Sequence, residues 1–79
     1  MDRIEELRLF LAAVEAGSLA AAGRRFGHSP PAMTRMLGAL EERLGVRLLE
    51  RSTRRLAPTE AGRRLAEQAR RLLADYAEA

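Results

Sequence analysis

Glycines and hydroxyl side chains divide this chain into helices at short intervals. Stretches of apolar residues at helical spacing are closed by three glycines, Gly17, Gly27 and Gly45. A hydroxyl side chain stands before each later stretch, at Ser18, Ser29 and Thr59. Glycine is favoured just beyond a helix because it adopts positive φ without strain, and Ser and Thr are favoured at helix starts because their oxygen accepts an early N–H. The pattern predicts helices over residues 4–16, 19–26, 30–44 and 60–78.

Two of these helices have a clear apolar face. In the first, apolar residues recur three and four apart and charged residues fill the other side: Ile4, Leu7, Phe10, Leu11 and Val14 against Glu5, Glu6, Arg8 and Glu15. In the third, the stripe predicted to be buried is Met33, Met36, Leu37, Leu40 and Leu44. At about 100° per residue, the opposite, outward face holds Pro31, Thr34, Arg35, Gly38 and Glu42.

Beyond the third helix the helical spacing stops. Two short candidate strands, 46–50 and 56–58, flank a polar tip at 51–55. The predicted fold class is therefore mainly α, with a three-helix core, a short two-stranded wing and a long C-terminal helix. The second and third helices, joined by a tight turn at Gly27 and His28, form a candidate helix-turn-helix.

The residue types that are scarce exclude several classes of protein. A chain of 79 residues holds one domain at most, and with no cysteine and one histidine it has no disulfide and no His/Cys metal site. The groups that catalytic sites need are missing, so we expect no enzyme, no catalytic residue, no metal and no cofactor. The apolar runs are too short to span a membrane and no export signal opens the chain, so we expect a cytoplasmic protein.

The positive charge of the chain indicates an acidic partner. All 14 basic residues are arginine, whose planar fork suits phosphates and base edges. Residues 47–71 contain eight arginines and three glutamates, although the whole chain has a net charge of only +3. Three of these arginines, Arg51, Arg54 and Arg55, crowd the wing tip, where they suit a phosphate backbone or a minor groove. A solvated charged surface is the alternative interpretation.

The outward face of the third helix carries side chains that suit DNA. In a helix-turn-helix, the second helix of the pair enters the major groove and reads it with its N-terminal residues. Arg35 suits both acceptors of guanine, and Thr34 suits a phosphate or a thymine methyl. Gly38 would let the helix backbone lie close to the groove wall. The alternative is a winged-helix protein-interaction module without DNA readout, which would carry large apolar side chains on this face.

The last helix has more apolar surface than the preceding residues can cover. The apolar face of a helix of this length must pack against other protein surface, and a second copy of the chain is the simplest partner. The residues expected at this homodimer interface are Leu65, Ala69, Leu72, Leu73 and Tyr76. The alternative is a tail that folds back on its own domain or frays.

Several short motifs resemble those of the LysR-type transcriptional regulators. They are Gly17-Ser18-Leu19 with Ala21-Ala22, Ser29 to Arg35, Leu40-Glu41, Leu44 to Arg51, and Pro58 to Gly62. The resemblance covers essentially the whole chain. It implies a winged helix-turn-helix DNA-binding domain over 1–58, with helix 30–44 in the major groove and the wing on the flanking backbone or minor groove. It also implies a linker and dimerisation helix over 59–79.

Carried over position by position, the resemblance implies a set of DNA contacts. Thr34 and Arg35 lie on the recognition helix, and Arg51, Thr53 and Arg54 lie in the wing. Thr59 is expected to cap the last helix and to touch a phosphate. With their neighbours, the candidate DNA-binding residues are Ser29, Pro30, Pro31, Thr34, Arg35, Gly38, Arg51, Thr53, Arg54, Arg55 and Thr59. The expected partner is double-stranded DNA, bound sequence-specifically to regulate transcription.

The chain departs from the family pattern at three residues and in length. The family usually has a base-reading glutamine at the position of Pro30, so base readout is expected to shift to the neighbouring residues. It has Val or Ile at the position of His28 and alanine at that of Gly23, where glycine lowers helix propensity by up to ~1 kcal/mol. Family members also carry a much larger effector-binding domain. We therefore expect this chain to be cut within the linker helix and to bind no small-molecule effector.

Overall fold

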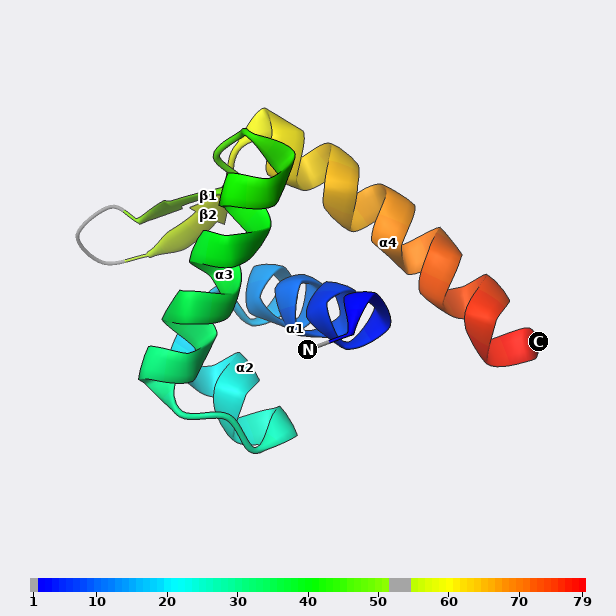
Figure 1. Ribbon diagram of the computed structural model, residues 1–79, viewed down its shortest axis with the longest axis horizontal. Coiled ribbons are helices and arrows are strands. Elements are labelled where there is room, and N and C mark those ends of the chain that lie inside the picture. The colour runs from blue at the N-terminus through cyan, green and yellow to red at the C-terminus, as the bar shows by residue number, and fades with distance from the viewer. Residues whose placement is uncertain (1, 52–54) are drawn as a thin grey trace.

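A computed structural model describes residues 2–51 and 55–79 of the chain. Over these residues it has four helices and one antiparallel hairpin, in the order α1 (Arg3–Ala16), α2 (Leu19–Phe26), α3 (Pro30–Leu44), β1 (Leu49–Arg51), β2 (Leu56–Pro58) and α4 (Glu60–Glu78) (Figure 1). The predicted fold class is confirmed, and each predicted helix agrees with the observed one to within one residue. The first strand differs, because only its last two predicted residues pair with β2, together with Arg51.

The predicted caps delimit the helices. A side-chain oxygen accepts the N–H three residues ahead, at 3.0 to 3.2 Å, at Ser18, Ser29 and Thr59. The residues with φ between 67° and 79° are the glycines at the helix ends, Gly17, Gly27 and Gly45. The starts of α2, α3 and α4 and the ends of α1, α2 and α3 therefore have a local reason that is visible in the sequence.

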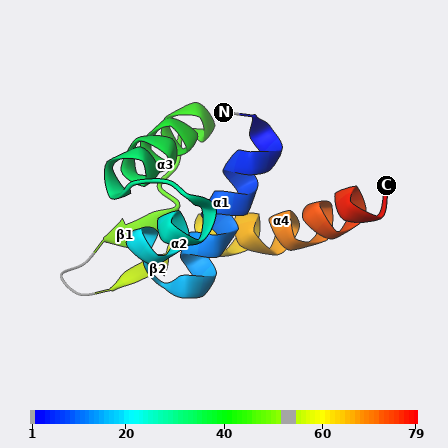
Figure 2. The same cartoon turned by 90° about the horizontal axis from the view of Figure 1, so that it is seen from below.

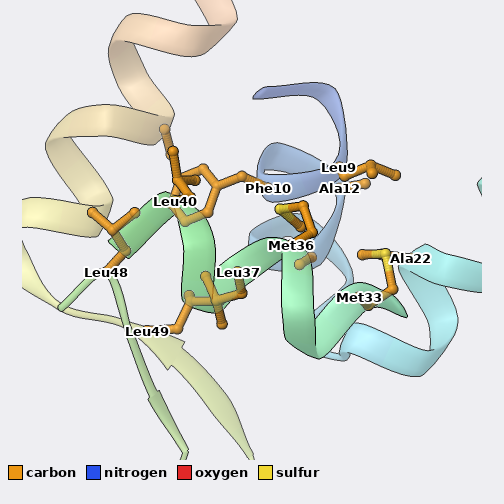
Figure 3. Packing of buried hydrophobic residues seen from close by; sticks show 12 residues of the cluster. Leu9, Phe10, Ala12, Ala22, Met33, Met36, Leu37, Leu40, Leu48 and Leu49 are labelled. Carbon is orange, nitrogen blue, oxygen red and sulfur yellow. The ribbon is translucent and has the colours of Figure 1, made fainter. Parts of the chain in front are cut away.

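The core lies where α1 meets the other three helices and the base of the hairpin. Its largest fully buried side chains are Phe10, Leu9, Met33, Leu37, Leu40, Leu48 and Leu49 (Figure 3). Four of the five residues predicted for the buried stripe of α3 are indeed buried. The prediction for Leu44 was wrong, since this side chain is 47% exposed. Helical spacing gives the face on which a residue lies, but it does not give the point at which the neighbouring elements stop covering that face.

Glu6 is a second exception to the predicted pattern. It was expected on the solvent side of α1, yet it is only 6% exposed. Its carboxylate accepts hydrogen bonds from both terminal nitrogens of Arg43 on α3, at 3.2 and 2.5 Å. The hydrogen bond to Glu6 raises the pKa of the Arg43 guanidinium above its usual value, so Arg43 stays charged as the pH rises. Because α2, α3 and α4 all pack on α1, this helix buries a wider face than a one-sided stripe, including Leu9.

Gly23 has a packing role that explains its place in α2. A Cβ at this position would stand 2.5 Å from the carbonyl oxygen of His28 and 2.9 Å from Cγ of Met33. Real Cβ atoms are not found so close to a backbone oxygen. The lower helix propensity of glycine is therefore offset by a close approach of the turn to α2, which alanine would prevent.

The first half of α4 belongs to the core. Gly62, Ala66 and Ala69 are buried, and Leu65 packs against the core cluster. The first half of α4 thus packs on the same core as the preceding residues, and the division at residue 58 into a winged domain and a linker helix stays a prediction. The second half of α4 leaves the core and projects away from the hairpin, as both views show (Figures 1 and 2).

Candidate nucleic-acid interface

The turn between α2 and α3 is tied to the rest of the domain. The N–H of His28 donates to the carbonyl oxygen of Gly23 at 2.8 Å. The imidazole Nε2 of His28, which is half-buried, lies 3.8 Å from the Glu5 carboxylate on α1. The start of α3 is therefore fixed relative to both α1 and α2, as a recognition helix requires.

The outward face of α3 is the one predicted from the sequence. Its members are all exposed, while Met33 and Leu37 on the other side are buried: Pro31, Thr34, Arg35, Gly38 and Glu42. Ser29 and Pro30 are exposed at the start of the same helix. The Ser29 cap uses an acceptor site of the hydroxyl and not its O–H donor. The structure thus gathers the predicted residues of α3 on one accessible surface.

The hairpin places arginines on an arm outside the helical core. Arg51 ends β1 opposite Leu56, and both Arg51 and Arg55 are exposed. The arm extends on the side opposite to the end of α4 (Figure 1). Two other predicted wing contacts, Thr53 and Arg54, lie outside the described residues.

The hydroxyl and the N–H of Thr59 form hydrogen bonds within the protein. Its hydroxyl donates to the carbonyl oxygen of Arg47 at 2.7 Å and accepts the N–H of Gly62 at 3.0 Å. Its own N–H donates to the carbonyl oxygen of Leu48 at 2.9 Å. A hydroxyl has one hydrogen, and a phosphate oxygen needs a donor. The predicted cap is confirmed, whereas a phosphate contact from this hydroxyl would break the bond to Arg47.

Glu41 is a positioning residue that the sequence analysis missed. One of its carboxylate oxygens accepts the N–H of Leu48 at 2.7 Å and the N–H of Leu49 at 3.2 Å, and it lies 4.0 Å from Nε of Arg47. This oxygen joins α3 to the start of the hairpin. The available signal was an acidic residue beside the buried stripe, one turn before the glycine that ends the helix.

Ion pairs neutralise much of the charge on α4. Arg64 lies 3.2 Å from Glu60, Arg70 lies 3.4 Å from Glu15, and Arg71 lies 3.8 Å from Glu67. The count of arginines over 47–71 therefore overstates what α4 offers to an acidic partner. The exposed Arg35 on α3 carries more weight for DNA binding than the arginines on α4.

The residues predicted for a dimer interface divide into two groups. Leu72 and Tyr76 are 48% and 55% exposed. Leu65 and Leu73 are half-buried, and Ala69 is 1% exposed within the chain itself, so Ala69 has no surface to offer a second copy. Leu65 and Leu72 line a groove of about 380 Å³ between α1 and α4, together with Leu7. The accessible apolar surface is therefore this groove and the last turns of α4.

The described residues offer neither a metal site nor a membrane-spanning helix. Over 2–51 and 55–79, His, Asp and Glu side chains form no group of three or more placed to hold a metal ion. Over the same residues, no helix combines the length and the apolar character needed to cross a lipid bilayer.

These features define the class of the protein. Three helices followed by a hairpin, with α2 and α3 joined by a fixed turn and an exposed Thr-Arg face on α3, form a winged helix-turn-helix domain. The chain belongs to the lysR family of bacterial regulatory helix-turn-helix proteins, whose family profile matches residues 4–63.

Curated relatives are transcriptional regulators of greater length. The chain is 50% identical over 68 residues to the HTH-type transcriptional regulator TfdS of Cupriavidus pinatubonensis, which covers 86% of this chain and 23% of TfdS. It is 41% identical over 75 residues to the regulator CrgA of Neisseria meningitidis, covering 95% of this chain and 25% of CrgA. The chain thus spans about a quarter of the length of these relatives.

Solved structures share the whole fold. The DNA-binding domain of BenM in complex with catB site 1 DNA superposes with a TM-score of 0.92 at 33% identity, covering 99% of this chain and 86% of that one. The DNA-binding domain of CbnR in complex with DNA gives a TM-score of 0.90 at 45% identity, with coverage of 99% and 88%.

Proposed function

We propose that this chain binds double-stranded DNA sequence-specifically, as the DNA-binding part of a LysR-type transcriptional regulator in the bacterial cytoplasm. The observation that carries the proposal is the exposed face of Thr34, Arg35 and Gly38 on the second helix of a helix-turn-helix. A helix presented in this way fits the major groove, where Arg35 can bond both acceptors of a guanine. The complexes of BenM and CbnR domains with DNA support the same use of this fold.

The wing supplies contacts that do not depend on sequence. Arg51 and Arg55 lie on an arm beside α3, so they can reach phosphates or the minor groove next to the site that α3 reads. Phosphate contacts release counterions from the duplex. The affinity should therefore fall with salt, with a slope of about −0.9 per phosphate neutralised.

The proposed binding unit is a homodimer formed through α4. The exposed Leu72 and Tyr76, and the groove that continues to Leu7 and Leu65, give an apolar surface that a second copy would cover. A symmetric dimer presents two copies of α3 to half-sites about one turn of DNA apart. In this arrangement residues 1–58 carry the DNA contacts and α4 joins the two copies.

Selection of bound fragments from a random duplex library, at near-physiological salt, tests the proposal. Enrichment of a two-fold symmetric site is the expected result. Retention of DNA without enrichment would contradict sequence-specific readout by α3 and leave only the phosphate contacts. The absence of any retention would overturn the proposal in favour of a protein-interaction module.

The composition of the α3 face separates these two functions. An interaction module would present large apolar side chains on this face, and the face instead carries Pro31, Thr34, Arg35 and Gly38. The large apolar side chains that are exposed in the described chain lie elsewhere: Leu44, Val46, Leu72 and Tyr76.

A further inference from the structure

The N-terminus of α3 has lost the main-chain donors that usually make a helix start polar. Pro30 and Pro31 occupy its first two positions and carry no N–H. The next two N–H groups are already used, because Ala32 donates to Oγ of Ser29 at 3.2 Å and Met33 donates to the carbonyl oxygen of Ser29 at 3.0 Å. A helix start ordinarily binds phosphate through these groups. The first four residues of α3 therefore have no unused N–H to offer to DNA.

The same two prolines give this helix start an apolar surface. Both rings are exposed. Residues four apart lie one above the other on a helix, so Pro30 is in line with Thr34 and Pro31 is in line with Arg35. The rings of the two prolines and the side chain of Thr34 therefore share one exposed surface with Arg35 at the start of α3. Neither proline can form a hydrogen bond with its side chain.

We infer that Pro30 and Pro31 recognise thymine through its C5-methyl group. The inference rests on the proposed function, since it applies only if α3 enters the major groove. Among the base edges displayed in that groove, the thymine methyl is the apolar one. A prolyl ring is rigid, so it loses little conformational freedom when it packs against a methyl group. The helix start thus reads shape and apolar contact, while Arg35 reads hydrogen-bond acceptors one turn further along.

Uracil tests this inference because it differs from thymine in DNA only by lacking the methyl group. The probe is the duplex of highest affinity selected from the random library, with each thymine replaced by uracil in turn. At one or two positions in each half-site we expect binding to weaken about 3- to 5-fold, which corresponds to losing one buried methyl group. At the remaining positions we expect no change.

Three variants show which residue causes the loss of affinity when thymine is replaced by uracil. Pro30→Gln should abolish the sensitivity to uracil at its position and favour adenine there, because glutamine bonds both N6 and N7 of adenine. Pro31→Ala should abolish the sensitivity at the neighbouring position. Thr34→Ser is the matched control: it removes the one methyl group among these three side chains and should leave both effects in place. Ser29 still caps the helix in all three, and circular dichroism checks that each one folds.

The outcomes separate this inference from the proposed function. If the protein selects a sequence but no thymine responds to uracil, the inference is wrong and the proposed function stands. The inference also fails if Thr34→Ser removes the uracil effect, or if the two proline variants keep it. If no duplex is retained, both are wrong.

Discussion

Replacing Gly38 with alanine is expected to stabilise the free protein and to weaken its complex with DNA. Gly38 is exposed in the interior of α3, and in the described part of the chain no atom outside its own stretch of helix lies within 4 Å of the place where a Cβ would stand. Alanine is favoured over glycine inside a helix by about 0.8–1.0 kcal/mol. Because nothing in the structure opposes this gain, the whole of it should appear in the free energy of unfolding.

A gain of this size is measurable in a small domain. About 1 kcal/mol raises the midpoint of thermal unfolding by roughly 4–8 °C for a domain of 60–100 residues. The assay is unfolding by heat and by urea, followed by circular dichroism at one fixed protein concentration, because dimerisation makes the midpoint depend on concentration. A neutral or destabilising result would show that helix propensity does not act at this position as argued.

Gly23→Ala is the matched control for this experiment. It is the same exchange inside a helix, but its Cβ would stand 2.5 Å from the carbonyl oxygen of His28. Overpacking of this kind costs about 1–3 kcal/mol, so the net effect should be destabilising. The opposite signs at Gly38 and Gly23 would show that space, and not glycine content, decides the outcome.

The second half of the prediction concerns the complex. If the backbone near Gly38 lies against the groove wall, a methyl group there should cost about 1 kcal/mol or more and weaken binding at least fivefold. Fluorescence anisotropy with the selected duplex measures the change. An unaltered affinity would refute a close approach of this part of α3 to DNA.

Three further predictions follow from the contacts described above. Leu72→Glu should convert the dimer to monomer in analytical ultracentrifugation. Leu44→Glu, at an equally exposed leucine on α3, should leave the dimer intact. The same sedimentation for both variants would contradict the α4 interface. Arg35→Ala should relax base preference, whereas Arg51→Ala should weaken all sequences alike and reduce the salt slope by about 1; the reverse pattern would exchange the two roles. Glu41→Ala should lower the free energy of unfolding by about 2–4 kcal/mol, because two buried N–H groups lose their acceptor; an unchanged urea midpoint would contradict this role.

Much of the fold was predictable because its signals are local. A cap joins residues three apart, and a glycine with positive φ depends only on its own backbone, so Ser29 and Gly45 could be assigned without any knowledge of the neighbouring helices. The outward face of α3 follows in the same way, because helical spacing alone sets Thr34 and Arg35 opposite Met33.

The features that were missed depend on what each helix meets. Glu6 is buried because Arg43, 37 residues further on, reaches its carboxylate. Leu44 is exposed because the burial of α3 stops one turn earlier. In the candidate site, the hydrogen bond from the Thr59 hydroxyl to Arg47, on the other side of the hairpin, could not be foreseen, and a phosphate contact at Thr59 stays a prediction.

The bonds around the base of the hairpin have a mechanical consequence. The carbonyl oxygens of Arg47 and Leu48 accept hydrogen bonds from Thr59, at the start of α4. The N–H of Leu48 donates to the carboxylate of Glu41 on α3. The base of the hairpin therefore cannot tilt against α3 or against the start of α4 without breaking at least one of these hydrogen bonds. Because the first half of α4 also packs in the core, the wing and α3 are held in a fixed relation to each other.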